Sequence, residues 1–410
     1  MKKPSITIFY QYDPWDSTIG GIQTTVSSFI KYAPPEFELR FVGITSERGR
    51  SLHQWHDMEL QGRSLKFMPV LYIEDDNRRN LLFPTTLRYT LALLRHRFNS
   101  DFMHFHRLEP ALATLRAPGD KTFFIHNDIH SQILSQEGGQ KNTMLWRYAP
   151  QVYGRLERFL LNQFTEILSC NSDSMALYRD RYPEVADRVS LIRNTVDNEL
   201  FYPLDPEIRD QRRRHQASRL GLSEETQFIL FAGRLHPQKD PLLLIHALAK
   251  LQNPEAHLLI AGEGELRSDV EAEILKLGLA SKVTLLGAMK QSQLAALHQL
   301  ASVCVLTSKF EGLPLVVLEA LACGTPIVST RCGETPKLLS PQSGLLCSDA
   351  HPSTVAAALD QVLAAPGQYP APSCLQDAHP YQAKTVIHEV YERMLARWRG
   401  RQPTPTAALS

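Results

Sequence analysis

The stretch KFEGLPLVVLEALACGTPIVST, residues 309–330, holds a polar loop, an apolar helical segment and a strand-like run in direct succession. Pro314 suits the first turn of a helix and Gly324 suits its end, so LPLVVLEALACG is expected to be helical. The runs SVCVLTS before it and TPIVST after it are rich in β-branched residues, which is typical of strands. This order of strand, helix and strand is that of a parallel sheet covered by helices.

The same alternation extends over the whole chain. Because 410 residues are too many for one hydrophobic core, the sequence predicts an α/β fold with two doubly wound, Rossmann-like domains. The expected strands are residues 5–11, 39–44, 101–106, 122–126, 166–170 and 189–192 in the first half, and 227–233, 256–262, 282–287, 302–308, 324–330 and 343–347 in the second.

Composition suggests where the domains meet. Residues 201–226 are polar and charged, and are interpreted as a linker followed by an exposed helix. They separate an N-terminal domain, residues 1–200, from a C-terminal domain, residues 227–370. The segment after residue 365 is rich in Pro and Ala and is expected to be irregular. Residues 382–400 are then expected to form an amphipathic helix that joins the N-terminal domain, and residues 401–410 a disordered tail.

Charge and cysteine usage exclude several classes of protein. Lys and Arg total 44 against 43 Asp and Glu, which disfavours a nucleic-acid partner. The six cysteines lie far apart with no CxxC pair, as in a cytoplasmic protein with reduced thiols. Gln11 and Asp13 interrupt the first apolar run, so a signal peptide is not expected. No run approaches the roughly 18 apolar residues that a membrane-spanning helix needs.

Two acids in the opening stretch call for an explanation. Glu311 is expected in the loop at the carboxyl end of a strand, where open α/β sheets bind ligands, and Gly312 lets the backbone approach such a ligand. The start of the following helix offers unpaired N–H groups to a phosphate. Glu319 stands inside an apolar helix, where a carboxylate needs a partner. A structural role, capping a loop or pairing with an arginine, is the alternative for Glu319.

A second loop supplies positive charge. In FAGRLHPQKDP a strand ends at Gly233, and Arg234 and Lys239 follow before the next helix. Two cations beside a helix N-terminus suit a leaving diphosphate, on which negative charge grows as the bond breaks. The nearby AGEGELRSD has Arg267 at the sixth position of a GxGxxG pattern, so the dinucleotide fingerprint is incomplete. No GxxxxGK[ST] motif of P-loop nucleotide hydrolases occurs.

These motifs, together and in order, carry a family resemblance. GGIQTTV, AGRLHPQKDP, GEGE, LLGAM and the opening stretch resemble the family-4 retaining glycosyltransferases (glycosyl transferases group 1) of the GT-B fold. The resemblance is dense over residues 227–347 and looser over residues 4–200. It implies two Rossmann-like domains facing a central cleft, with the nucleotide sugar held mainly by the C-terminal domain. It also implies that neither a metal ion nor a cofactor is needed, since the nucleotide sugar is a substrate.

Roles follow from the resemblance, residue by residue. Glu319 would hold the ribose hydroxyls and Glu311 the sugar hydroxyls, so that the two acids mark opposite ends of one donor. The expected catalytic residues are His126, Arg234, Lys239 and Glu311, and the expected donor-binding residues are Gly20, Gly21, Arg234, Lys239, Ala288, Met289, Glu311, Gly312, Leu313, Leu315 and Glu319. His106 is expected to line the acceptor side.

The resemblance also implies a reaction. A hexose would pass with retention of configuration from a nucleotide sugar to a hydroxyl of a saccharide or lipid-linked saccharide, in polysaccharide or glycolipid biosynthesis. UDP-glucose is the expected donor. No second acid is found to face Glu311 as a retaining hydrolase would require. The resemblance implies front-face transfer instead, in which the departing phosphate oxygen takes the acceptor's proton. The usual Asn-Gly pair appears as Asn194-Thr195, which puts a backbone contact expected there in doubt.

Two other functions stay open. His104, His106, His126 and His130 could together form the metal site of a hydrolase. An inactive module that only binds nucleotide sugars would use the same donor residues as the transferase.

Membrane contact is a separate expectation. The apolar segment 81–100 ends in Arg95, His96 and Arg97, which suits peripheral contact with the inner face of a membrane that carries the acceptor. A packed helix with a solvated end would give the same pattern.

Overall fold

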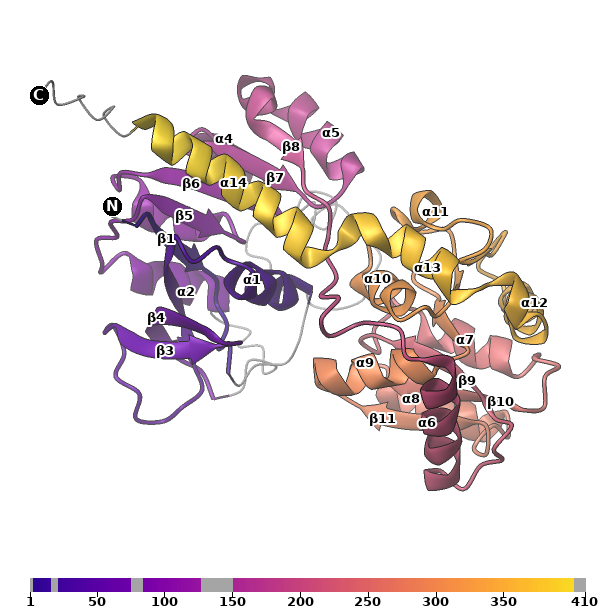
Figure 1. Cartoon of the computed structure of the whole chain (residues 1–410). Coiled ribbons are helices and arrows are strands. Elements are labelled where there is room, and N and C mark those ends of the chain that lie inside the picture. The colour runs from indigo at the N-terminus through magenta and orange to yellow at the C-terminus, as the bar shows by residue number, and fades with distance from the viewer. Residues whose placement is uncertain (1–2, 16–20, 75–83, 127–149, 402–410) are drawn as a thin grey trace, which may run out of the picture. The chain divides into compact units, whose positions relative to one another are not determined.

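The computed structural model describes residues 3–15, 21–74, 84–126 and 150–401. The chain divides into two compact units, Met1–Arg193 with Lys384–Ser410, and Asn194–Ala383 (Figure 1). Residues 194–200 and 371–383, which the sequence analysis left in the N-terminal domain or outside both domains, therefore lie in the second unit. The expected tail from residue 402 onward lies outside the described residues.

The first unit contains an eight-stranded sheet in the order β3-β4-β2-β1-β5-β6-β7-β8. All neighbouring strands are parallel except β3 and β4. The strand order reverses between β1 and β5, which makes that point a ligand-binding candidate. The strands are β1 (Ser5–Phe9), β2 (Glu38–Thr45), β3 (His56–Leu60), β4 (Arg63–Tyr72), β5 (Phe102–Phe105), β6 (Asp120–Ile125), β7 (Glu166–Ser169) and β8 (Val189–Leu191).

The antiparallel hairpin of β3 and β4 was not expected from the sequence. Gln61 and Gly62 form its two-residue turn, and both have positive φ, 51° and 74°. Such a turn matches the twist of paired strands and normally contains Asn or Asp before the glycine. The alternating exposure of β3 confirms a strand half-covered on one side. Gln in place of Asn at the turn hid the signal.

Helices of the first unit are α1 (Gly21–Lys31), α2 (Thr85–Leu93), α4 (Pro150–Leu161), α5 (Ser172–Arg181) and α14 (Ala383–Arg401), with 3-10 turns at Glu109–Thr114 and Pro183–Arg188. No helix among the described residues is long and apolar enough to cross a bilayer.

The C-terminal helix α14 is tied to the first unit by a row of arginines. Arg393 donates to Glu166 at 2.9 Å, and Arg397 donates to Asp120 at 2.9 Å and to Glu166 at 3.1 Å. Arg401 also bonds Asp120. The arginines recur every four residues and therefore share one face of the helix. Their partners are the first residues of β7 and β6, so the last helix of the chain closes the first domain (Figure 1).

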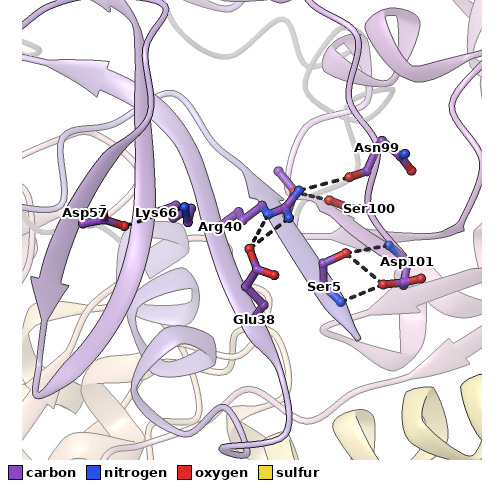
Figure 2. Close-up of polar contacts among 9 residues, drawn as sticks. Ser5, Glu38, Arg40, Asp57, Lys66, Asn99, Ser100 and Asp101 are labelled. Carbon is purple, nitrogen blue, oxygen red and sulfur yellow. Dashed lines mark hydrogen bonds and ion pairs between the residues drawn. The ribbon is translucent and has the colours of Figure 1, made fainter. Parts of the chain in front are cut away.

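The amino ends of the first sheet form a separate polar region (Figure 2). Asp101 accepts from the backbone N–H and the hydroxyl of Ser5, at 2.8 and 2.9 Å. Arg40 pairs with Glu38 and donates to the carbonyl of Asn99 at 3.1 Å. Each of these charged side chains is engaged by an opposite charge, a hydroxyl or a backbone group. Together the contacts join the amino ends of β1, β2 and β5.

The second unit contains a six-stranded, all-parallel sheet in the order β11-β10-β9-β12-β13-β14. Its order reverses between β9 and β12, again the place where such sheets bind ligands. The strands are β9 (Gln227–Ala232), β10 (Ala256–Ala261), β11 (Val283–Gly287), β12 (Val303–Leu306), β13 (Ile327–Ser329) and β14 (Gly344–Leu346). The helices are α6 (Pro206–Arg219), α7 (Pro241–Leu248), α8 (Arg267–Lys276), α9 (Gln291–Leu300), α10 (Leu315–Ala322), α11 (Thr335–Leu338), α12 (Pro352–Ala364) and α13 (Ala371–Ala378).

The Pro-rich segment after residue 365 is more regular than expected. It forms α13 between 3-10 turns at Pro366–Gln368 and His379–Tyr381. Pro372 stands in the first turn of α13, where a missing N–H costs nothing. Cys374 and Ala378 bury the inner face of α13. The prediction of an irregular chain was wrong. A proline such as Pro372 is compatible with a helix when it stands in the first turn.

Candidate functional site

The loops after β9 and β12 meet at the reversal point of the second sheet. Thr307 donates from Oγ1 to the carbonyl of Lys239 at 2.9 Å. The N–H of Lys309 donates to the carbonyl of Gln238 at 2.8 Å, and the Gln238 amide donates to the carbonyl of Phe310 at 2.9 Å. Three bonds between two loops fix their relative position. The residues expected at this sheet edge are thus presented on a rigid frame.

Lys239 and Glu311, predicted from separate motifs, form an ion pair. The Lys239 ammonium donates to Oε1 of Glu311, and their side chains are 21% and 10% exposed. The Lys239 stem passes over Gly233, whose position would bring a Cβ to 3.8 Å from it. Asp240 has φ 44° and caps α7 by accepting from the N–H of Leu243 at 3.3 Å. The partly exposed Lys239 and the mostly buried Glu311 are therefore paired where the loops after β9 and β12 meet.

Arg234 lies on the exposed side of the same loop. Within the residues that the structure describes, no hydrogen bond or ion pair engages its guanidinium, which leaves all its donors available. The glycines of GEGE have a structural task beside it. A Cβ at Gly262 would stand 1.9 Å from the carbonyl oxygen of Gly233, and one at Gly264 would stand 2.3 Å from that of Leu235. The GEGE motif therefore lets the loop after β10 cross the loop that carries Arg234.

The backbone at the start of α10 has occupied carbonyls and open N–H groups. The carbonyl of Gly312 accepts from the N–H of Glu334 at 2.9 Å, and that of Leu313 accepts from the Asn194 amide at 2.7 Å. Over the described part of the chain, the N–H groups of Gly312, Leu313 and Leu315 donate no hydrogen bond. Open donors at a helix start are suited to an anion or a sugar oxygen.

The Asn194 contact answers the question raised by the missing glycine of the Asn-Gly pair. Asn194 holds the loop after β12 through its side chain. The following Thr195 is buried and is not among the described residues with positive φ. The turn therefore needs no glycine.

Glu319 lies deep in the α10 face, with 7% of the residue exposed. It pairs with His298 of α9, whose Nε2 lies 3.7 Å from Oε2. The arginine or loop cap considered for Glu319 is absent from the described residues, and its neighbour is a histidine that the sequence analysis did not single out. Glu311 and Glu319 make no contact with each other there.

Ala288 and Met289 follow β11 directly. Ala288 is exposed, and the partly buried Met289 packs against a core cluster of the second unit. The described residues add no polar contact that tests their expected role in donor binding.

In the first unit, His106 and His126 are brought together at the ends of β5 and β6. Nδ1 of His106 lies 2.9 Å from Nε2 of His126, and Nδ1 of His126 lies 3.6 Å from Sγ of Cys170. Burial, with the positive charge of Arg107, lowers the pKa of His126 to about 3, and burial lowers the pKa of His106 well below its usual value. Both rings are therefore neutral near pH 7, and the bond between them joins two neutral groups.

The hydrolase alternative finds no support in the described residues. They contain no group of three or more His, Cys, Asp or Glu side chains able to hold a metal ion. His104 is fully buried against the rings of Phe29, Phe124 and Tyr391. His130 and Gly20 lie outside the described residues, whereas Gly21 begins α1.

Solved structures place the fold in a known class. Sucrose-phosphate synthase from Thermosynechococcus elongatus matches 97% of this chain and 100% of its own at 18% identity, with a TM-score of 0.75. The glycosyltransferase WaaG, involved in lipopolysaccharide biosynthesis, matches 95% and 99% at 17% identity, with a TM-score of 0.71. HepE from Anabaena, solved with UDP and glucose, matches 96% and 100% at 17% identity, with a TM-score of 0.69. The fold is the GT-B fold, as the motifs predicted.

The family match is equally direct. Residues 212–373 match the family described as glycosyl transferases group 1, which confirms the resemblance over this part of the chain. A D-inositol 3-phosphate glycosyltransferase from Frankia alni is 32% identical over 53% of this chain and 55% of its own length. An uncharacterized glycosyltransferase from Methanocaldococcus jannaschii is 31% identical over 43% and 45%. The chain thus spans about half the length of these curated relatives.

Proposed function

We propose that the protein is a glycosyltransferase that moves a sugar from a nucleotide-sugar donor to a hydroxyl group. The observation that carries the proposal is the junction of the loops after β9 and β12, where Lys239, Glu311 and the open N–H groups of α10 share one edge of the sheet. The match of residues 212–373 to group 1 glycosyltransferases supports it.

The donor diphosphate would lie across Lys239 and Arg234. Lys239 already neutralises Glu311, so an arriving diphosphate would compete for the ammonium and leave Glu311 to accept from sugar hydroxyls. Arg234 would add bidentate donors to the phosphate oxygens. As the bond from the sugar to the phosphate breaks, these fixed charges stabilise the growing negative charge on the leaving group. Protein cations thereby do the work that a metal ion does elsewhere, and activity should be independent of metal.

Retention of configuration is part of the same proposal. A double displacement needs a carboxylate nucleophile close to the reacting carbon and a second acid beside it. Glu311 has Lys239, not another acid, as its partner. We therefore favour front-face transfer, in which the departing phosphate oxygen takes the proton of the attacking hydroxyl. His126 would contact the sugar as a neutral hydrogen-bonding group, and His106 would line the acceptor side.

UDP-glucose is the proposed donor, since a structural neighbour is described in complex with UDP and glucose. A saccharide or lipid-linked saccharide is the proposed acceptor, in line with a neighbour involved in lipopolysaccharide biosynthesis. We propose cytoplasmic action, with α2 touching the membrane that carries the acceptor. Leu91 and Leu94 of this region are 52% and 54% exposed beside exposed Arg95 and Arg97, a combination that suits anionic lipid. Sedimentation with anionic vesicles would test this contact.

A panel of nucleotide sugars tests the function. Binding and slow hydrolysis of UDP-, GDP- and ADP-sugars are measured with and without a chelator, and product configuration is read by NMR. Selective use of one donor, unaffected by the chelator and with retained configuration, is the expected result. Chelator-sensitive turnover would favour a metal hydrolase. Binding of one donor without any product, across a broad acceptor panel, would leave a nucleotide-sugar binding module.

A further inference from the structure

A pair of buried groups, His298 and Glu319, lacks the hydrogen bonds that buried groups normally have. His298 has no exposed surface, and both of its ring nitrogens are without a partner. The Glu319 side chain accepts no hydrogen bond from the described residues, and its Oε2 lies 3.7 Å from Nε2 of His298. Buried polar groups without partners cost free energy, so a pair of them in contact needs an explanation.

The end of α9 holds the histidine rigidly. Its own carbonyl accepts from Oγ1 of Thr325 at 2.6 Å. Arg209 donates to the carbonyls of Gln299 at 3.1 Å and Ala301 at 2.6 Å. Side-chain donors on the last carbonyls fix a helix terminus. The imidazole is therefore presented to Glu319 from a backbone with little freedom, as the support of a binding group requires.

Glu319 and His298 differ in how far they are exposed to solvent. The Glu319 side chain keeps 10% of its surface open, whereas the His298 side chain has none. A ligand can therefore touch Glu319 directly, whereas it can act on His298 only through Glu319. One carboxylate oxygen faces the imidazole, which leaves the other for a ligand.

We propose that His298 is a positioning residue for the donor nucleotide: its Nε2–H donates to Oε2 of Glu319 and turns the other carboxylate oxygen toward the ribose hydroxyls. The inference rests on the proposed function, because it takes Glu319 as the ribose contact. Closing 3.7 Å to a hydrogen-bond distance of about 2.8 Å needs only a small side-chain rotation. A ligand that draws Glu319 into place would give Nε2 of His298 the hydrogen-bond partner that it lacks.

Affinity for two nucleotides tests this role. Calorimetry compares UDP, or the nucleoside diphosphate that the donor panel selects, with its 2′,3′-dideoxy analogue. The wild type should prefer the ribose form by about tenfold or more, as expected for a hydrogen bond to a charged group. His298→Ala should lose most of this preference by weakening UDP alone, and His298→Gln, whose amide can replace Nε2–H, should restore part of it. An unchanged preference in His298→Ala overturns the proposal.

The control is another buried histidine of the same unit. His257 of β10 lies 2.8 Å from the Thr284 hydroxyl, and His257→Gln should keep the full ribose preference whatever it does to stability. Should His298→Ala fail to fold, the wild type still decides: with ¹⁵N-labelled histidine, UDP but not its dideoxy analogue should slow exchange of one imidazole N–H. No change overturns the inference. If the wild type binds no nucleotide at all, the proposed function itself fails.

Discussion

The two sheets reverse strand order at corresponding places, yet the loops there offer opposite chemistry. In the second unit, the reversal between β9 and β12 presents Lys239, Arg234 and open backbone N–H groups. In the first unit, the reversal between β1 and β5 ends in His106, whose neutral ring packs against Tyr10, Phe124 and His126. One edge suits an anion, and the other suits an uncharged hydroxyl-bearing molecule. Two sheets of the same class can thus present different chemistry through their loop residues alone.

Removing the charge of the second edge should have the largest effect. Lys239→Ala is expected to lower kcat/KM by about 100-fold or more, the usual loss when one group that stabilises transition-state charge is deleted. The loss should appear in kcat as well as in donor affinity. Steady-state kinetics with the donor selected by the panel measures both.

Lys309→Ala is the matched control. Lys309 stands on the neighbouring loop, 54% exposed and 3.6 Å from Asp240, so its loss should change kcat/KM by less than about twofold. Equal losses in both variants would mean that Lys239 acts only through general positive charge, and the comparison of the two edges would lose its basis.

Much of this contrast could be predicted from the sequence, because local pattern carries it. Each expected strand is present. Short runs of β-branched residues between helical segments are typical of strands in a parallel sheet. Lys239 and Glu311 were expected at one edge because each follows a parallel strand of the same sheet. The hairpin of β3 and β4 and the helix α13 were missed for local reasons, an unusual turn residue and prolines at a helix start.

Contacts between distant segments could not be predicted. Nothing in LAALHQLA distinguishes His298 from an ordinary core histidine, and only the packing of α9 on α10 brings it to Glu319. The glycines of GEGE were interpreted only as an incomplete dinucleotide fingerprint and a family motif, whereas their closeness to the carbonyls of Gly233 and Leu235 shows a backbone crossing. Such roles depend on which loops touch, and sequence order does not give that.

The crossing gives a second, smaller way to disturb the charged edge. In Gly264→Ala the new methyl would meet the Leu235 carbonyl at 2.3 Å, so the backbone beside Arg234 must move. Strain of about 1–3 kcal/mol is typical of such overpacking, and donor affinity should fall about tenfold. Calorimetric titration of the donor measures the loss.

Gly278→Ala provides the comparison within the same unit. Gly278 has φ 69° and open space around the position of a Cβ. Its substitution should cost about 1 kcal/mol of stability through the left-handed backbone and leave donor affinity unchanged. A Gly264→Ala protein that binds the donor as well as Gly278→Ala does would show that the crossing does not position Arg234.

The smallest expected effect concerns the neutral histidines of the first unit. Burial lowers the pKa of His104 to about 3, with a further contribution from Arg397. The folded protein resists protonation of such a histidine, whereas the unfolded chain takes up the proton near its ordinary pKa of about 6.5. The free energy of unfolding is therefore highest above pH 6.5 and decreases as pH falls toward the folded pKa. Wild type should therefore lose about 1.4 kcal/mol of unfolding free energy through this residue between pH 7.5 and 5.5.

His104→Phe should remove that loss, because the ring already packs against Phe29, Phe124 and Tyr391 and neither nitrogen has a hydrogen bond to give up. Denaturant unfolding at the two pH values, followed by hydrogen exchange of β5 and β6 amides, measures the difference. Phe124→Leu disturbs the same packing without removing a titrating group, so its curves should shift in parallel with wild type. If His104→Phe keeps the wild-type pH dependence, the ring is not held neutral, and the first unit is less apolar at its reversal point than its packing indicates.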